Sequence, residues 1–89
     1  MKLLIIEDEQ KIAAALKRGL QREGYVVDTE DNGDDGLDSG LSGDYNLIVL
    51  DRMLPGSMEG VEVCRKLREG KINTPVIMLT AKDAVVDRI

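Results

Sequence analysis

Histidine, phenylalanine and tryptophan are all absent from this sequence of 89 residues, and cysteine occurs once. Without histidine, the lone Cys64 has no partners for a zinc site of the cysteine–histidine kind, and it cannot close an intramolecular disulfide. We therefore expect Cys64 to be a small core residue. Because aromatic residues make up only 2% of the chain, the core has to come from aliphatic side chains.

Long hydrophobic runs are missing as well. The opening apolar run, residues 1–6, is too short for the core of a signal peptide and is stopped by Glu7, Asp8 and Glu9. No apolar run approaches the roughly 20 residues that a membrane-spanning helix requires. The formal net charge of -5 disfavours direct binding of nucleic acid by this segment. We expect a single domain in the cytoplasm, with no membrane contact.

What the chain does contain is a regular alternation of apolar runs and helical patterns. Short runs rich in branched aliphatic residues predict β-strands at residues 3–6, 25–27, 47–50 and 76–79. Three of these runs are apolar at nearly every position, which is typical of strands buried on both faces of a parallel sheet.

Helical spacing of apolar residues predicts three helices between the strands and part of a fourth after them. The predicted helices cover residues 9–23, a short segment around Leu37 and Leu41, residues 59–69 and residues 83–89. Gly24 and Gly70 are expected to end the first and third helices. The alternation predicts an α/β fold: a flavodoxin-like, doubly wound parallel sheet of four strands in the order 2-1-3-4, with about three and a half helices.

Polar residues follow directly where several of the predicted strands end. Glu7 and Asp8 follow the first strand, Asp51 the third and Thr80 the fourth. In an open parallel sheet, ligands bind at this carboxyl edge, so three carboxylates converge if the first and third strands are neighbours. Close carboxylates repel each other unless a cation offsets them, and hard oxygen ligands favour Mg²⁺. A carboxylate placed like that of Asp51 can act as a nucleophile toward phosphorus.

Three motifs in this chain resemble the successive motifs of receiver domains, the phosphorylatable modules of two-component response regulators. They are Leu-Ile-Ile-Glu-Asp-Glu at residues 4–9, Leu-Ile-Val-Leu-Asp-Arg-Met-Leu-Pro-Gly at 47–56 and Pro-Val-Ile-Met-Leu-Thr-Ala-Lys at 75–82. Their order and spacing also resemble those of the family. Residues 82–89 resemble the winged-helix (OmpR/PhoB-type) transcriptional subfamily.

The resemblance implies roles for the residues around the predicted strand ends. Asp51 matches the phosphoacceptor, Asp8 the direct ligand of Mg²⁺, and Glu7 the acid that holds the metal through water. Met53 matches the position whose backbone carbonyl is a metal ligand, and its side chain is expected to pack in the interior. The implied function is that of a signalling module, not an enzyme, which takes a phosphoryl group from a sensor histidine kinase.

Two further residues take roles from the same resemblance. Thr80 matches the switch hydroxyl and Ala81 the small residue that leaves room for the phosphoryl group. By the same comparison, residues 1–89 are expected to be an incomplete, C-terminally truncated receiver. The end of the fourth helix, the fifth strand and the fifth helix would be missing, with a phosphate-contacting lysine and an aromatic switch residue. The implied output is altered dimerisation and control of a DNA-binding effector domain in a longer parent protein.

Other interpretations of the same residues remain open. Asp8 also suits an N-cap of the first helix, and Thr80 suits a cap or turn. A receiver fragment without its last strand would be unable to signal and would expose residues 76–79 as a sheet edge, which favours a homodimer or a domain-swapped oligomer. A phosphohydrolase with an Asp nucleophile is a third reading, but Met53 stands where such enzymes carry a second acid.

Overall fold

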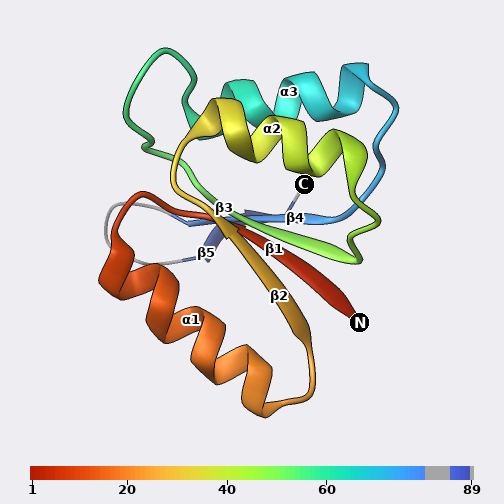
Figure 1. Cartoon of the computed structure of the whole chain (residues 1–89). Helices are drawn as coiled ribbons and strands as arrows, with labels where there is room; N and C mark the ends of the chain where they lie inside the picture. The colour runs from red at the N-terminus through yellow and green to blue at the C-terminus, as the bar shows by residue number, and fades with distance from the viewer. Residues whose placement is uncertain (80–84, 89) are drawn as a thin grey trace.

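The computed structural model describes residues 1–79 and, for the backbone alone, residues 85–88. Four parallel strands take the order β2-β1-β3-β4 across a twisted sheet (Figure 1). The strands are β1 (Lys2–Ile6), β2 (Val26–Glu30), β3 (Leu47–Asp51) and β4 (Val76–Leu79). The predicted flavodoxin-like fold and the predicted order of these four strands are confirmed.

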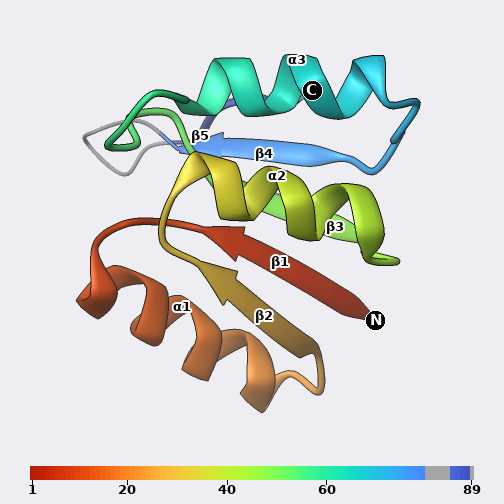
Figure 2. The same ribbon diagram turned by 45° about the horizontal axis from the view of Figure 1, so that its top comes forward.

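Helices cover both faces of the sheet. Helix α1 (Gln10–Arg22) lies on one face, while α2 (Gly33–Ser42) and α3 (Gly60–Glu69) lie side by side on the other (Figures 1 and 2). Gly24 follows α1 with a φ of 90°, the left-handed conformation that the sequence predicts there. None of the helices in the described part of the chain has the length and apolar character needed to cross a membrane.

Alternation along β1 divides the core between the two faces. Leu4 and Ile6 belong to the apolar cluster beneath α2 and α3, whereas Leu3 and Ile5 belong to a smaller cluster beneath α1. Successive side chains of a strand point to opposite faces, and all four are buried because helices cover both. Strand β1 is therefore an interior strand of the sheet, with β2 on one side and β3 on the other.

Helix α2 packs against the sheet through glycines as well as through the half-buried Leu37. Gly33, Gly36 and Gly40 are buried, whereas Leu41 is exposed. A Cβ added at Gly36 would lie 2.6 Å from the Ile6 side chain, so only glycine lets the helix approach β1 this closely. The glycines that weaken α2 as an isolated helix thus allow its close packing against the sheet.

The end of the chain differs from the prediction. Val85–Arg88 form β5, which pairs antiparallel with β4, so the predicted helix is wrong for these residues. The expected open edge along Val76–Leu79 is wrong for the same reason. Without β5, β4 would present a row of unpaired backbone groups, and β-branched residues such as Val85 and Val86 favour a strand. The rest of the predicted helix lies outside the described residues.

Candidate functional site: a carboxylate cluster at the carboxyl edge of the sheet

The register of the two central strands brings the predicted acids together. Strands β1 and β3 are neighbours, with Ile6 opposite Leu50, so Glu7, which follows β1, lies beside Asp51, the last residue of β3. Glu7, Asp8 and Asp51 each offer a carboxylate oxygen, and these three oxygens lie within 4.8 Å of one another. The predicted convergence of three carboxylates is therefore present.

Glu7 is the buried member of this cluster, with 4% of its surface exposed. Its backbone N–H donates to the carbonyl of Glu30 at 2.9 Å, and its side-chain Oε2 accepts a hydrogen bond from the backbone N–H of Glu9 at 3.0 Å. Burial raises the pKa of Glu7 to about 7, and the neighbouring carboxyl groups of Asp51 and Asp8 act in the same direction. The hydrogen bond from the backbone N–H of Glu9 lowers the pKa, but its effect is smaller than that of burial.

Asp51 ends β3, and its surroundings hold both its side chain and its backbone. Its Oδ1 accepts a hydrogen bond from the backbone N–H of Met53 at 3.1 Å. The next residue, Arg52, donates its backbone N–H to the carbonyl of Leu79 and accepts from the N–H of Gly60, both at 3.0 Å. The peptide after the phosphoacceptor candidate is thus tied to β4 on one side and to α3 on the other.

Two side chains lie differently from the sequence-based expectations. The N-cap of α1 is Glu9, not Asp8, so the capping interpretation of Asp8 is wrong and its carboxylate remains with the cluster. The Met53 side chain is 60% exposed, so the expectation that it packs in the interior is also wrong. Neither difference removes an oxygen atom from the candidate site, because the role expected of Met53 uses only its backbone carbonyl.

The donor set fits a hard divalent cation. All three side chains offer carboxylate oxygens, which suit Mg²⁺. Among residues 1–79, the ion pairs involve other carboxylates and leave these three without a basic partner. The raised pKa of Glu7 comes mainly from its burial and is increased by the neighbouring carboxyl groups, and a bound cation would oppose it.

Thr80 and Ala81, predicted as the switch hydroxyl and the small residue beside it, lie outside the described residues. The strand that leads to them is placed: Leu79 is the register partner of Asp51. The sequence analysis missed Gly60, whose backbone contacts the peptide after Asp51. Its position at the start of a helix, nine residues after the acid, carries no distinctive local signal.

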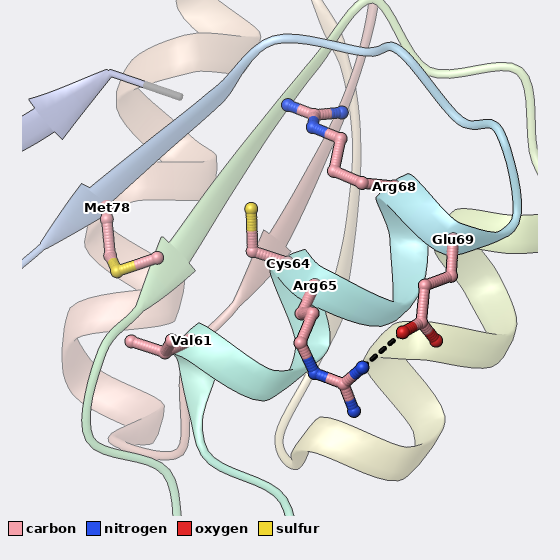
Figure 3. A pocket seen from close by; sticks show the side chains of 6 residues that line it. All are labelled: Val61, Cys64, Arg65, Arg68, Glu69 and Met78. Carbon is pink, nitrogen blue, oxygen red and sulfur yellow. Dashed lines mark hydrogen bonds and ion pairs between the residues drawn. The ribbon is translucent and has the colours of Figure 1, made fainter.

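A separate hollow of about 500 Å³ lies between α3 and β4 (Figure 3). Its lining is largely apolar and includes Val61, Cys64 and Met78, while Arg65 is ion-paired with Glu69. Cys64 is buried, as expected of a core residue. Among the described lining residues, Glu69 is the one carboxylate, so the chemistry indicated by the sequence belongs to the cluster of Glu7, Asp8 and Asp51.

Comparisons with known proteins agree with this geometry. A family model described as "response regulator receiver domain" matches residues 3–89. The chain is 51% identical over 87 residues to the response regulator ArlR of Staphylococcus aureus, covering 98% of this chain and 39% of ArlR. It is 47% identical over 88 residues to the transcriptional regulatory protein ResD of Bacillus subtilis, covering 99% of this chain and 36% of ResD. The chain thus spans less than two fifths of these relatives.

Solved structures show the same similarity. The response regulator TrrA of Thermotoga maritima, in a complex with Mg²⁺ and BeF, has a TM-score of 0.83 and 41% identity, covering 90% of this chain and 69% of that one. In a second structure TrrA is bound to the histidine kinase ThkA, with a TM-score of 0.81, 41% identity, and coverage of 90% and 68%.

Proposed function

Because this chain belongs to the response regulator receiver family of two-component systems, we propose that Asp51 accepts a phosphoryl group from a sensor histidine kinase. The observation that carries this proposal is the cluster of Glu7, Asp8 and Asp51 at the carboxyl edge of the sheet. The kinase complex and the Mg²⁺–BeF complex of TrrA support the choice of donor and of metal.

In the proposed reaction, an oxygen of the Asp51 carboxylate forms a bond to phosphorus while the P–N bond of a phosphohistidine breaks. The imidazole nitrogen keeps the electron pair of that bond, and the product is an acyl phosphate on Asp51. The N–H of Met53 orients the carboxylate through its hydrogen bond to Oδ1. The backbone bonds of Arg52 to Leu79 and Gly60 limit movement of the strand end during the attack.

Glu7, Asp8, Asp51 and the backbone carbonyl of Met53 are the groups that would hold Mg²⁺. When bound, Mg²⁺ supplies positive charge that offsets the carboxylates and the charge on the transferred group. Glu7 has to lose its proton to support a cation, and its raised pKa makes this step sensitive to pH near neutrality. Asp8 and Asp51 stay accessible to solvent, as an incoming donor requires.

The same proposal extends to the roles that depend on a longer chain. Thr80 would act as the switch hydroxyl and Ala81 would leave space beside it. Both relatives are more than twice as long as this chain, and ResD is a transcriptional regulatory protein, which supports a receiver that controls a DNA-binding effector of the winged-helix type in the cytoplasm. We propose that residues 1–89 are the larger part of such a receiver domain.

A titration with Mg²⁺ and beryllofluoride, followed by NMR, tests this function. We expect saturable shifts at Glu7, Asp8 and Asp51 in the wild type and their loss in Asp51→Asn. Asp44→Asn is the matched control, because Asp44 is exposed and precedes β3 at the opposite end of that strand.

Three other results would contradict the proposal. A folded wild type without such shifts would indicate a receiver fragment unable to signal. Steady release of phosphate from small phosphate esters would indicate a phosphohydrolase. Retention of the shifts in Asp51→Asn would place the site elsewhere.

A further inference from the structure

We propose that Gly60 is a positioning residue of the phosphoacceptor site. The absence of a side chain lets the first turn of α3 rest directly on the Asp51–Arg52 peptide, and this contact sets where Asp51 and Met53 lie. The role in phosphoryl transfer rests on the function proposed above. The contact itself does not.

The space at Gly60 is closed by backbone atoms. A Cβ added there would fall well inside 3.0 Å of the carbonyl oxygen of Asp51 and 2.8 Å from the Cα of Arg52. Neither atom belongs to a side chain that can rotate away, so a larger residue has to displace α3 or the end of β3. Gly60 is itself buried, and its N–H donates to the carbonyl of Arg52 at 3.0 Å.

Conformational freedom does not explain this glycine. The described glycines with positive φ are Gly24 and Gly56, and Gly60 is not one of them. It is the first residue of α3, where alanine is intrinsically more favourable than glycine. Steric room beside Asp51 is therefore the physical requirement at this position.

The contact reaches the carboxylate through a short path. Arg52 lies between Gly60 and Leu79, bonded to each through its backbone. Asp51 precedes it, and Met53 follows it and donates to the Asp51 carboxylate. A displacement at Gly60 is thus passed to both the proposed nucleophile and the proposed carbonyl ligand of the metal.

Gly40 provides a matched comparison. It is also a buried helical glycine, and a Cβ there would lie 2.8 Å from Cδ2 of Leu67. That atom is the end of a flexible side chain, and the contact lies between α2 and α3, away from the carboxylates. Gly40→Ala therefore disturbs packing to a similar degree without pressing on the strand end.

The experiment compares Gly60→Ala with Gly40→Ala in the whole chain. Mg²⁺ affinity, the rate of phosphorylation by acetyl phosphate, the melting temperature and the amide shift of Met53 are measured for both. We expect Gly60→Ala to lose roughly 10- to 100-fold in Mg²⁺ affinity and to move the Met53 amide, because supporting groups of metal ligands have effects of this size. Gly40→Ala should lower the melting temperature while its Mg²⁺ affinity and Met53 amide match the wild type.

The readouts separate this inference from the proposed function. If the wild type binds no Mg²⁺ and accepts no phosphoryl group, the proposed function fails, and the amide shifts of residues 51–53 still decide the positioning role. Equal changes in the two variants, or an unchanged Met53 amide in Gly60→Ala, would overturn it. A Gly60→Ala chain that unfolds while Gly40→Ala folds would overturn it too, since Gly60 would then serve folding rather than positioning.

Discussion

The two ends of the sheet treat charge in opposite ways. At the carboxyl end, three carboxylates lie within 4.8 Å of one another, without a basic partner among residues 1–79. Toward the amino end, Asp28 accepts a hydrogen bond from the hydroxyl of Tyr45 at 2.7 Å and lies 3.9 Å from the ammonium group of Lys2. One end gathers like charges, whereas the other pairs opposite ones.

The amino end is a small network that joins three strands. The Lys2 ammonium lies 4.9 Å from the centre of the Tyr45 ring, and the backbone N–H of Lys2 donates to the side chain of Asn46 at 2.8 Å. These contacts tie β1 and β2 to the start of β3. The difference teaches that the two ends of the same strands have different roles. Contacts between opposite charges at the amino end stabilise the sheet, whereas the carboxylates at the carboxyl end repel one another, and a cation can offset that repulsion.

The largest effect is expected from a substitution in the carboxylate cluster at the carboxyl end. Asp8→Asn should weaken Mg²⁺ binding by about tenfold or more, equivalent to about 1.4 kcal/mol, because it removes a charged oxygen ligand. Isothermal titration with Mg²⁺ measures the affinity. Glu9→Gln is the control, since Glu9 is the neighbouring exposed acid and makes no side-chain cap bond. Equal affinities for Asp8→Asn and the wild type would mean that Asp8 is not a ligand.

The second prediction concerns pH. The pKa of Glu7 in the folded state is raised to about 7 from a usual 4.5, so the folded state favours the protonated form. Its stabilising contribution is complete below pH 4.5 and is lost as pH rises through about 7. In metal-free buffer, the free energy of unfolding of the wild type should therefore fall over this interval relative to Glu7→Gln.

Urea titrations at several pH values measure this difference. Saturating Mg²⁺ should reduce the loss in the wild type, because a ligand that binds only the folded state stabilises it. If the free energy of unfolding of the wild type and of Glu7→Gln changed with pH in the same way, the pH dependence would not come from Glu7.

A smaller effect is expected at the amino end. Tyr45→Phe removes the hydrogen bond to Asp28 and should lower the free energy of unfolding by about 1 kcal/mol, with Mg²⁺ affinity unchanged. Tyr25→Phe is the matched control, because Tyr25 packs against the apolar cluster beneath α1. Chemical denaturation measures the free energy of unfolding, and Mg²⁺ titration measures whether the carboxylate cluster is affected. A loss of Mg²⁺ affinity in Tyr45→Phe would show that the two ends are coupled.

The smallest effect is expected for the ion pair. Lys2 and Asp28 are both partly exposed, so Lys2→Met should cost less than about 1 kcal/mol. The methionine keeps the apolar stem of the side chain, which isolates the charge. Denaturation at low and high salt is the measurement, and the difference from the wild type should shrink in high salt. A salt-independent loss would assign the effect to packing.

Much of the fold follows from local pattern. The spacing of apolar residues predicted α1 and α3 to within one residue at each end, and β4 was predicted with its observed bounds. The last segment was predicted wrongly, because Val85–Arg88 form a strand that pairs with β4, and the spacing of apolar residues does not reveal this pairing. The exposure of Met53 was also missed, since spacing does not reveal which side of a loop faces solvent.

By itself, the sequence determined the order of strands and helices and placed an acid after each of the two central strands. Only the tertiary structure decided the register of β1 against β3, which sets Glu7 beside Asp51, and the burial of Glu7, which raises its pKa. It also decided that Gly60 rests on the peptide after Asp51. The physical reason is distance along the sequence. Apolar periodicity is a pattern among near neighbours, whereas the pKa of Glu7 and the space at Gly60 depend on residues that come into contact only when the sheet has formed.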